Sequence, residues 1–80
     1  MKRTNLTTLD TLCPGQRARI DSLCCSGALH RRLEELGMVK DTEIQCLYRG
    51  PGGTPIACCV RGTVIALRTS DAASIRICME

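Results

Sequence analysis

Residues 26–38 of the chain read SGALHRRLEELGM, the segment whose pattern is helical at both of its ends. Leu29, Leu33 and Leu36 recur at spacings of four and three residues, which places them on one face of a helix. A helix of this length is too short to persist alone in water. We therefore expect the leucine face to dock on a sheet whose strands come from the rest of the chain.

The two ends of this segment predict where the helix starts and stops. Ser26 is a suitable N-cap, because its hydroxyl can accept a hydrogen bond from a free N–H of the first turn. Gly37 stands where a helix ends in the left-handed conformation, after which Met38 can fold back onto Leu33. The sequence thus predicts a short helix that ends just before Gly37.

Outside the helix, the sequence predicts strands separated by turn residues. Gly50 to Gly53 form the strongest loop signal, Arg61-Gly62 reads as a tight hairpin turn, and Ser70 is expected to cap a single helical turn. In the second strand, alternation predicts Ile44, Cys46 and Tyr48 on one face, with Gln45, Leu47 and Arg49 on the other. The expected strands are residues 16–23, 43–49, 54–60, 63–68 and 75–78.

This order of elements predicts a mainly β fold with a short helix, an SH3-like small β-barrel of about five strands. The α-helix occupies the first long connection, and one helical turn precedes the last strand. Residues 1–80 are expected to form a single domain, with residues 1–8 flexible. Closing the barrel would remove the exposed sheet edges that invite aggregation.

The composition excludes some classes of function. The chain has no Phe or Trp and a single Tyr, so its core must be aliphatic, and it lacks the aromatic platforms on which single-stranded nucleic acids stack. The net charge of +3 is spread along the chain without a basic block, which is typical of an ordinary solvated surface. We predict no nucleic-acid partner.

Seven cysteines in 80 residues raise the question of the redox compartment. The chain begins Met1-Lys2-Arg3 and continues with polar residues, so no apolar segment of an export signal is present. No apolar run is long enough to span a membrane. We therefore predict a cytoplasmic protein whose cysteines are thiols.

The chain has two vicinal cysteine pairs, Cys24-Cys25 and Cys58-Cys59, and lacks the C-x-x-C spacing that is typical of a structural zinc site. Alternation along a strand predicts that Cys58 faces the core and that Cys59 faces outward. The phases of Cys46 and Cys78 also indicate core positions. The weak candidates for binding Fe2+ or another transition metal are Cys24, Cys25 and Cys59, joined by Cys13 in one arrangement.

No catalytic motif stands out. His30 is the single histidine, which excludes a two-histidine ferrous site and leaves no partner for a nucleophilic triad. The glycines of residues 50–53 lie between strands and lack the Lys-Ser/Thr of a phosphate-binding loop. We predict that the protein is not an enzyme and carries no firmly bound cofactor.

Several segments resemble the FeoA family. They are HRRLEELGM at residues 30–38, PGGTPI at 51–56, VRGTVIALR at 60–68, DAASI at 71–75 and the opening L-x-x-L-x-P-G-Q that starts at Leu9. The resemblance runs from Leu9 to Ile77, in the order and spacing of the family. One departure follows the helix, where family members commonly carry Pro-Gly-Thr and this chain has Lys40-Asp41-Thr42. Asp tolerates the left-handed conformation that this turn needs.

The resemblance implies a small cytosolic accessory protein that binds FeoB, the membrane ferrous iron transporter, through its cytosolic G-protein region. Such a protein modulates iron uptake and reaches the membrane only through its partner. The chain is also similar to the C-terminal SH3-like domain of iron-dependent repressors. Two alternatives are therefore a thiol-based transition-metal-binding protein and an SH3-like regulatory or peptide-binding module. No oligomeric state is predicted.

The helix segment supplies the candidate partner contacts, which are Arg31, Arg32, Glu35, Gly37 and Met38. The charged side chains around the leucine stripe are consistent with two interpretations. One is a docked helix whose outer face is simply solvated, and the other is a surface that a transporter recognises. The resemblance favours the second interpretation, because an accessory protein needs an exposed patch.

Overall fold

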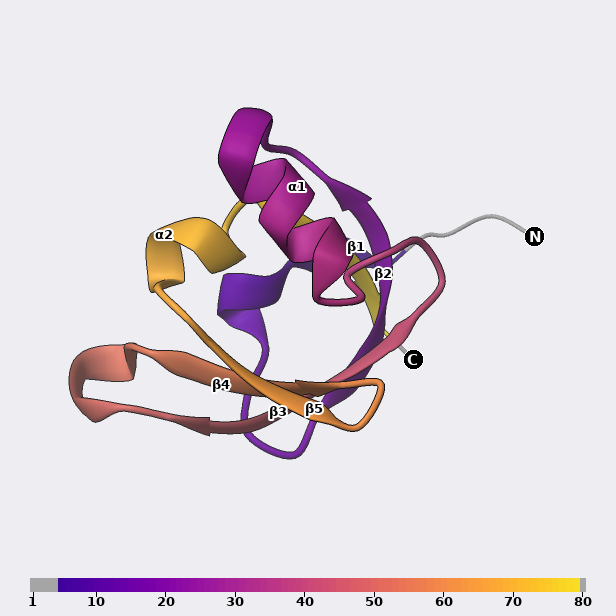
Figure 1. Ribbon diagram of the computed structural model, residues 1–80. Helices are drawn as coiled ribbons and strands as arrows, with labels where there is room; N and C mark the ends of the chain where they lie inside the picture. Colours follow the sequence, from indigo (N-terminus) through magenta and orange to yellow (C-terminus); the bar gives the residue numbers. More distant parts are fainter. Residues whose placement is uncertain (1–4, 80) are drawn as a thin grey trace.

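The computed structural model describes residues 5–79, which form one antiparallel sheet with two short α-helices and two single turns of 3₁₀ helix (Figure 1). The predicted helix and all five predicted strands are confirmed, and a sixth strand precedes them. In chain order the elements are β1 (Leu6–Thr8), η1 (Leu9–Thr11), β2 (Arg17–Leu23), α1 (Gly27–Glu35), β3 (Glu43–Arg49), η2 (Pro51–Gly53), β4 (Ile56–Val60), β5 (Thr63–Leu67), α2 (Thr69–Ala72) and β6 (Ile75–Met79).

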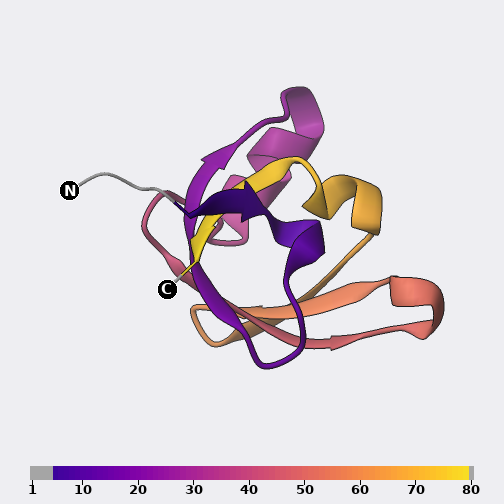
Figure 2. The same ribbon diagram turned by 180° about the vertical axis from the view of Figure 1, so that it is seen from behind.

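The strands are ordered β1-β6-β2-β3-β4-β5 across the sheet. Figures 1 and 2 show two arms, one formed by β1, β6 and β2 and the other by β3, β4 and β5, with α1 and α2 over the open side. The mainly β, SH3-like architecture is confirmed. The expected closure is wrong, because within residues 5–79 β1 and β5 stand at the two ends of the sheet and do not pair with each other.

The core between the arms is entirely apolar among the described residues, and no polar or charged side chain is buried there. Leucines of η1, alternating residues of the strands and one leucine of α1 meet in a single cluster. Its largest fully buried side chains are Leu9, Leu12, Ile20, Leu33, Met38, Ile44, Ile56, Val60, Ile75 and Ile77, together with Cys46 and Cys58.

The start of the chain is more ordered than its polar sequence predicts. Residues 1–4 lie outside the described residues, but Leu6 and Thr8 pair with Cys78 and Arg76 of β6. Leu9 then enters the core from η1. Within the segment 1–8 that was expected to be flexible, residues 6–8 therefore form strand β1, which the sequence did not predict.

A bulge in β3 changes which side chains face the core. The register of β3 against β4 shifts between Cys46 and Tyr48, so Leu47 is an additional residue. Because one extra residue reverses every later side chain, Tyr48 points outward and is 57% exposed. Arg49 turns inward instead, and its Nη1 donates to the carbonyl oxygens of Asp10 at 2.8 Å and Leu12 at 3.1 Å. The predicted faces of Tyr48 and Arg49 are thus wrong.

The end of α1 is built as the sequence predicts. The N–H of Gly37 donates to the Glu34 carbonyl at 3.0 Å, and the N–H of Met38 donates to the Leu33 carbonyl at 3.0 Å. This pair of bonds defines a Schellman ending, and Gly37 has φ of 99°. At the other end Ser26 occupies the N-cap position, but its side chain makes no capping hydrogen bond, so that part of the prediction is wrong.

The turn after α1 confirms the role of Asp41, which has φ of 70°. Its N–H donates to the Ile20 carbonyl at 2.7 Å, and the Arg19 side chain donates to the Asp41 carbonyl at 2.9 Å. These bonds to β2 hold a non-glycine residue in the left-handed conformation. By contrast, Ser70 lies inside α2, whose N-cap is Arg68, so the predicted capping by Ser70 is wrong.

Candidate partner-binding surface

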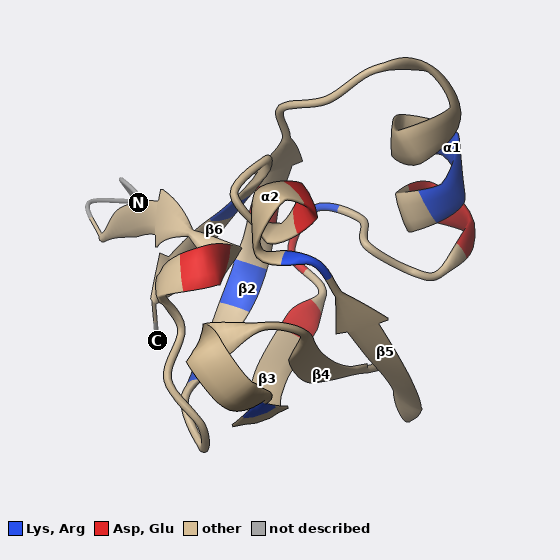
Figure 3. Cartoon of the chain, turned by 90° about the vertical axis from the view of Figure 1, so that its left-hand side faces the viewer, with Lys and Arg blue, Asp and Glu red and all other residues tan. Residues whose placement is uncertain are grey.

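The exposed side of α1 carries charges of both signs. Leu33 is buried at 1% exposure, whereas Leu29 and Leu36 pack on the core only in part. Arg31, Arg32 and Glu35 are exposed, and we call these three residues the helix face. Figure 3 shows blue and red segments side by side on α1. One fully buried leucine and two partly buried ones thus anchor a helix whose charged side is open to a partner.

On the opposite flank of α1, His30 is half-buried and lies beside Glu34. Its Nε2 is 3.5 Å from a carboxylate oxygen of Glu34, one helical turn away. This pairing uses the single histidine of the chain on the helix surface. It leaves the helix face as the side of α1 with arginines available for contact.

Gly37 and Met38 have different positions from those expected of partner contacts. Met38 is fully buried in the core, so it is removed from the predicted contact surface. Gly37 is half-buried beneath the side chain of Arg61, which comes from the turn between β4 and β5. A Cβ atom added at Gly37 would lie 3.0 Å from Cδ of Arg61. The end of α1 and this turn therefore form one corner of the molecule.

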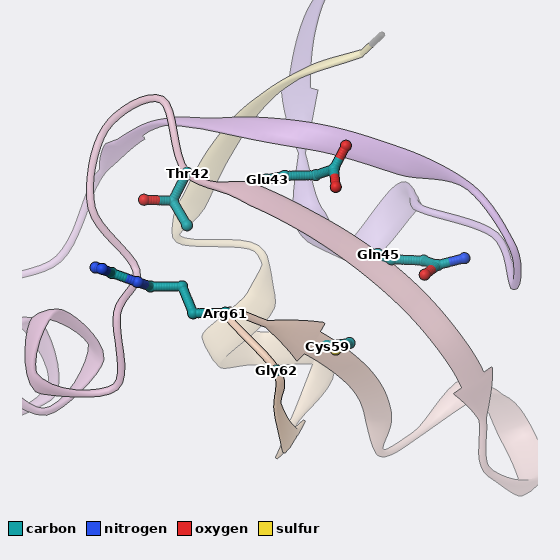
Figure 4. A pocket seen from close by; sticks show the side chains of 6 residues that line it. All are labelled: Thr42, Glu43, Gln45, Cys59, Arg61 and Gly62. Atoms are coloured by element: carbon teal, nitrogen blue, oxygen red, sulfur yellow. The ribbon is translucent and has the colours of Figure 1, made fainter.

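A shallow hollow of about 260 Å³ adjoins this corner (Figure 4). Figure 4 shows Arg61 reaching from the turn toward the segment after α1, while Glu43 and Gln45 project from β3. The lining residues are Thr42, Glu43, Gln45, Cys59, Arg61 and Gly62. Because the hollow is open and carries one acidic and one basic side chain, it suits a protein side chain better than an enclosed small-molecule ligand.

The side of β3, β4 and β5 that faces away from the core is largely apolar. Cross-strand partners share a face of a sheet, so the register defines two rows across this side. One row joins Gln45, Cys59 and Val64, and the other joins Tyr48, Ala57 and Ala66. We call these six residues the outer sheet face; Ala57 is fully buried among them, and the other five are exposed or half-buried. Val64 is 61% exposed on it, which is the largest exposed fraction among the exposed large apolar side chains of residues 5–79.

The structure separates the cysteines that were weak metal candidates. Cys24 is exposed and Cys25 half-buried between β2 and α1, whereas Cys59 lies on the outer sheet face. Within the described part of the chain, no three His, Cys, Asp or Glu side chains are grouped to hold a metal ion. Cys13 is exposed in the turn before β2. Cys78 is half-buried beside Arg19 and Leu6, so its predicted place in the core is wrong.

Two thiols are confirmed as interior residues. Cys46 and Cys58 are fully buried and face each other across β3 and β4. Burial raises the pKa of the Cys58 thiol to about 12, and the neighbouring Cys46 adds to the rise. Burial also raises the pKa of Cys46, against an opposing effect of Arg49. Both groups therefore stay protonated at neutral pH and behave as small apolar side chains.

The helix segment alone did not indicate Arg61 or the outer sheet face as candidate surface residues. The signal for the second was present, because Thr63–Leu67 reads TVIAL, with apolar residues at both phases of a strand. Such a run indicates either two covered faces or one exposed apolar face. The position of Arg61 above Gly37 depends on how the sheet bends, which no local pattern encodes.

Comparison with known proteins agrees with this geometry. The family model of the FeoA domain matches residues 7–78. No curated protein matches the chain. Within residues 5–79, no helix has the length and apolar character that crossing a membrane requires.

Three solved structures show how far the similarity extends. The iron(II) transport protein A of Clostridium thermocellum is 37% identical with a TM-score of 0.87, over 91% of this chain and 45% of that one. FeoA of Stenotrophomonas maltophilia, a prokaryotic SH3 domain protein solved with zinc, is 36% identical with a TM-score of 0.81, over 89% of this chain and 88% of that one. IdeR of T. acidophilum is 17% identical with a TM-score of 0.83, over all of this chain and 37% of that one, a likeness of fold alone.

Proposed function

The chain belongs to the FeoA family, whose members are associated with ferrous iron transport, and we propose that it is an accessory protein of that process. In this proposal it binds the cytosolic G-protein region of a FeoB-type membrane transporter and modulates the uptake of Fe2+. It works in the cytoplasm and reaches the membrane through this partner. Its contribution is binding, and Fe2+ is the cargo of the transporter.

The observation that carries the proposal is that different residues of α1 hold the helix on the core and face the solvent. Leu33 holds the helix on the core, and the Schellman ending at Gly37 fixes where the chain turns back. The helix face is not needed for either task, because Arg31, Arg32 and Glu35 are all exposed. Charged side chains on a rigid helix give a partner both orientation and specificity. This arrangement supports a docking role for the helix face.

Arg32 is the residue of the helix face to which we assign the leading contact. It lies on the flank of α1 nearest the leucine stripe, since it is adjacent to Leu33 and one turn before Leu36. A partner that covers the edge of the stripe would therefore desolvate Arg32. Arginine at such a position makes strong charge-assisted hydrogen bonds to carboxylates.

Co-purification with the intact transporter tests the proposal. We expect the wild-type chain to co-purify and Arg32→Glu to lose at least tenfold in recovery, while its thermal stability stays near that of wild type. Arg76→Glu is the matched control, because Arg76 is also exposed but lies on β6. Equal recovery of Arg32→Glu and wild type would exclude the helix face from the contact. Failure of the wild-type chain itself to co-purify would contradict the accessory role.

A further inference from the structure

The free edge of strand β5 is a second exposed surface, separate from the helix face. β5 stands at the end of the strand order and pairs with β4 alone within residues 5–79. Figure 3 shows β5 as the outermost strand of its arm, with no other strand beyond it. An edge strand presents unpaired N–H and C=O groups to its surroundings, so it is a template for another chain.

The hairpin geometry identifies which backbone groups point outward. Val60 and Thr63 flank the two-residue turn, and Arg61 and Gly62 both have positive φ, as the turns that favour hairpins require. Residues flanking such a turn form a hydrogen-bonded pair, and these pairs alternate along the ladder. Thr63, Ile65 and Leu67 therefore bond to β4. Val64 and Ala66 direct their N–H and C=O groups away from it, and these two residues define the β5 edge.

This edge lacks the features with which proteins usually protect an exposed strand. Charged side chains, proline and bulges are the common devices. β5 reads TVIAL, it contains neither charge nor proline, and its register against β4 is unbroken. Its inner side chains, Ile65 and Leu67, are each 6% exposed, so the strand is held firmly from one side. The edge is therefore both rigid and open.

Two arginines mark the ends of this strand. Arg61 precedes β5 by two residues and Arg68 follows it directly, and both are exposed. Neither has an ion pair with another residue of the described range. At about 3.3 Å per residue, Thr63 to Arg68 span roughly 17 Å along the strand, and Arg61 lies beyond Thr63 in the turn. A segment that lies along β5 would meet the Arg68 side chain at one end and, beyond the other end, the Arg61 side chain, whose Cδ lies over Gly37.

These charges disfavour a second copy of the chain as the occupant. In the register that pairs all five residues of β5 with a copy of itself, Thr63 would lie opposite Leu67 of the partner copy. Arg68 would then lie opposite Gly62 of the partner copy, next to Arg61 of the partner copy. Like charges so placed oppose pairing. The same positions attract carboxylates, so an acidic segment fits where a copy does not.

We propose that the β5 edge is a docking site for an extended segment of a partner protein with acidic side chains at both ends. The segment adds a strand beside β5, and its backbone bonds to Val64 and Ala66. Its carboxylates lie near Arg61 and Arg68, and its alternate side chains contact the outer sheet face at Val64. Strand addition of this kind draws affinity from the backbone and specificity from the flanking contacts.

This inference rests on the proposed function for the identity of the partner, which is the cytosolic region of the transporter. The two surfaces are compatible, because Arg61, in the turn before β5, lies over Gly37 at the end of α1. A partner could therefore contact the helix face with a folded part and the β5 edge with an extended part.

Amide hydrogen exchange of the full chain, with and without the transporter's cytosolic region, tests the proposal. We expect exchange at Val64 and Ala66 to slow at least tenfold on binding. Ile65 is the internal control, because its N–H already bonds within the ladder and should change little. Binding without protection at Val64 and Ala66 overturns this inference and leaves the proposed function standing. Absence of binding overturns both.

Two variants separate the backbone and the charge contributions. Ala66→Pro removes one outward N–H from an edge position that tolerates proline, and it should weaken binding at least fivefold. Arg68→Glu should weaken binding at least fivefold and leave the residues of β5 unchanged, whereas Arg76→Glu should not weaken binding. If Arg68→Glu and Arg76→Glu bind alike, the acidic segment is excluded. Protection of Val64 and Ala66 that depends on protein concentration in the absence of partner would identify a dimer instead and overturn the proposal.

Discussion

The end of α1 and the turn that leads into β5 meet at one corner of the molecule, yet the helix and the strand are built and exposed in opposite ways. α1 has one fully buried anchor, Leu33, and presents charged side chains whose backbone is already satisfied within the helix. β5 is buried along one whole side and presents uncharged side chains and unpaired backbone groups. The first surface can be recognised by its side chains and the second by its main chain.

This difference predicts which substitutions each region should tolerate. A substitution on the helix face alters recognition and leaves the fold intact, because the anchor lies elsewhere. A substitution of an inner side chain of β5, Ile65 or Leu67, lowers the stability of the fold, because both side chains belong to the core.

Replacing the anchor of α1 should have the largest effect. Leu33→Ala is expected to lower the free energy of unfolding by about 2–5 kcal/mol, since it empties a fully buried site. Leu29→Ala is the matched control and should cost clearly less, because Leu29 is only partly buried. Urea denaturation of both variants measures the difference. Equal losses would show that α1 is held by its whole leucine stripe.

The corner between the two regions should be the next most sensitive. Gly37→Ala is expected to cost more than about 1 kcal/mol, because φ of 99° strains any residue with a side chain. The new Cβ would also approach Cδ of Arg61 to 3.0 Å. Combining Gly37→Ala with Arg61→Ala should recover the part of the loss that comes from this approach. Full stability of Gly37→Ala by thermal unfolding would contradict the tight corner.

The buried thiol of Cys58, on β4 opposite Ile65 of β5, should make the protein less stable at alkaline pH. Its pKa rises from 9.0 to about 12 on folding, so the folded chain binds the thiol proton more tightly than the unfolded chain does. The resulting stability is complete below pH 9 and is lost as the pH rises toward 12. At pH 10 the loss should be about 1.4 kcal/mol. In Cys58→Ala this part of the pH dependence should disappear, whatever its stability at neutral pH; an unchanged slope between pH 8 and 11 would argue against a buried thiol.

The smallest effects on stability are expected at the exposed residues of both regions. Arg31→Glu on the helix face and Val64→Thr at the β5 edge should each stay within about 0.5 kcal/mol of wild type in urea denaturation. Val64→Thr retains a β-branched side chain, so the strand keeps its propensity. A larger loss at either position would mean that the exposed surface also supports the fold.

The fold was largely predictable because its signals are local. The leucine spacing, the glycine that ends α1 and the Arg61-Gly62 turn each act over a few residues. The bulge at Leu47 was not predictable, since one inserted residue leaves no mark in composition yet reverses Tyr48 and Arg49. β1 escaped prediction for a related reason, because three polar-flanked residues become a strand only when β6 lies beside them.

The candidate surface was predictable only in part. The charged positions of α1 follow from helical periodicity, so Arg31, Arg32 and Glu35 are exposed as expected. The prediction that Met38 contacts a partner is wrong, because the Schellman ending that terminates the helix also directs this side chain into the core. The β5 edge depends on the order of strands across the sheet, which is a property of the whole fold.

The most direct test of the account is a titration of the isotopically labelled chain with the transporter's cytosolic G-protein region, followed through its backbone amide resonances, with and without nucleotide. We expect saturable changes centred on the helix face and the β5 edge. The η2 turn, at the far end of the β3–β4 hairpin in Figure 1, should remain unchanged. The absence of saturable changes, or changes confined to η2, would contradict the account.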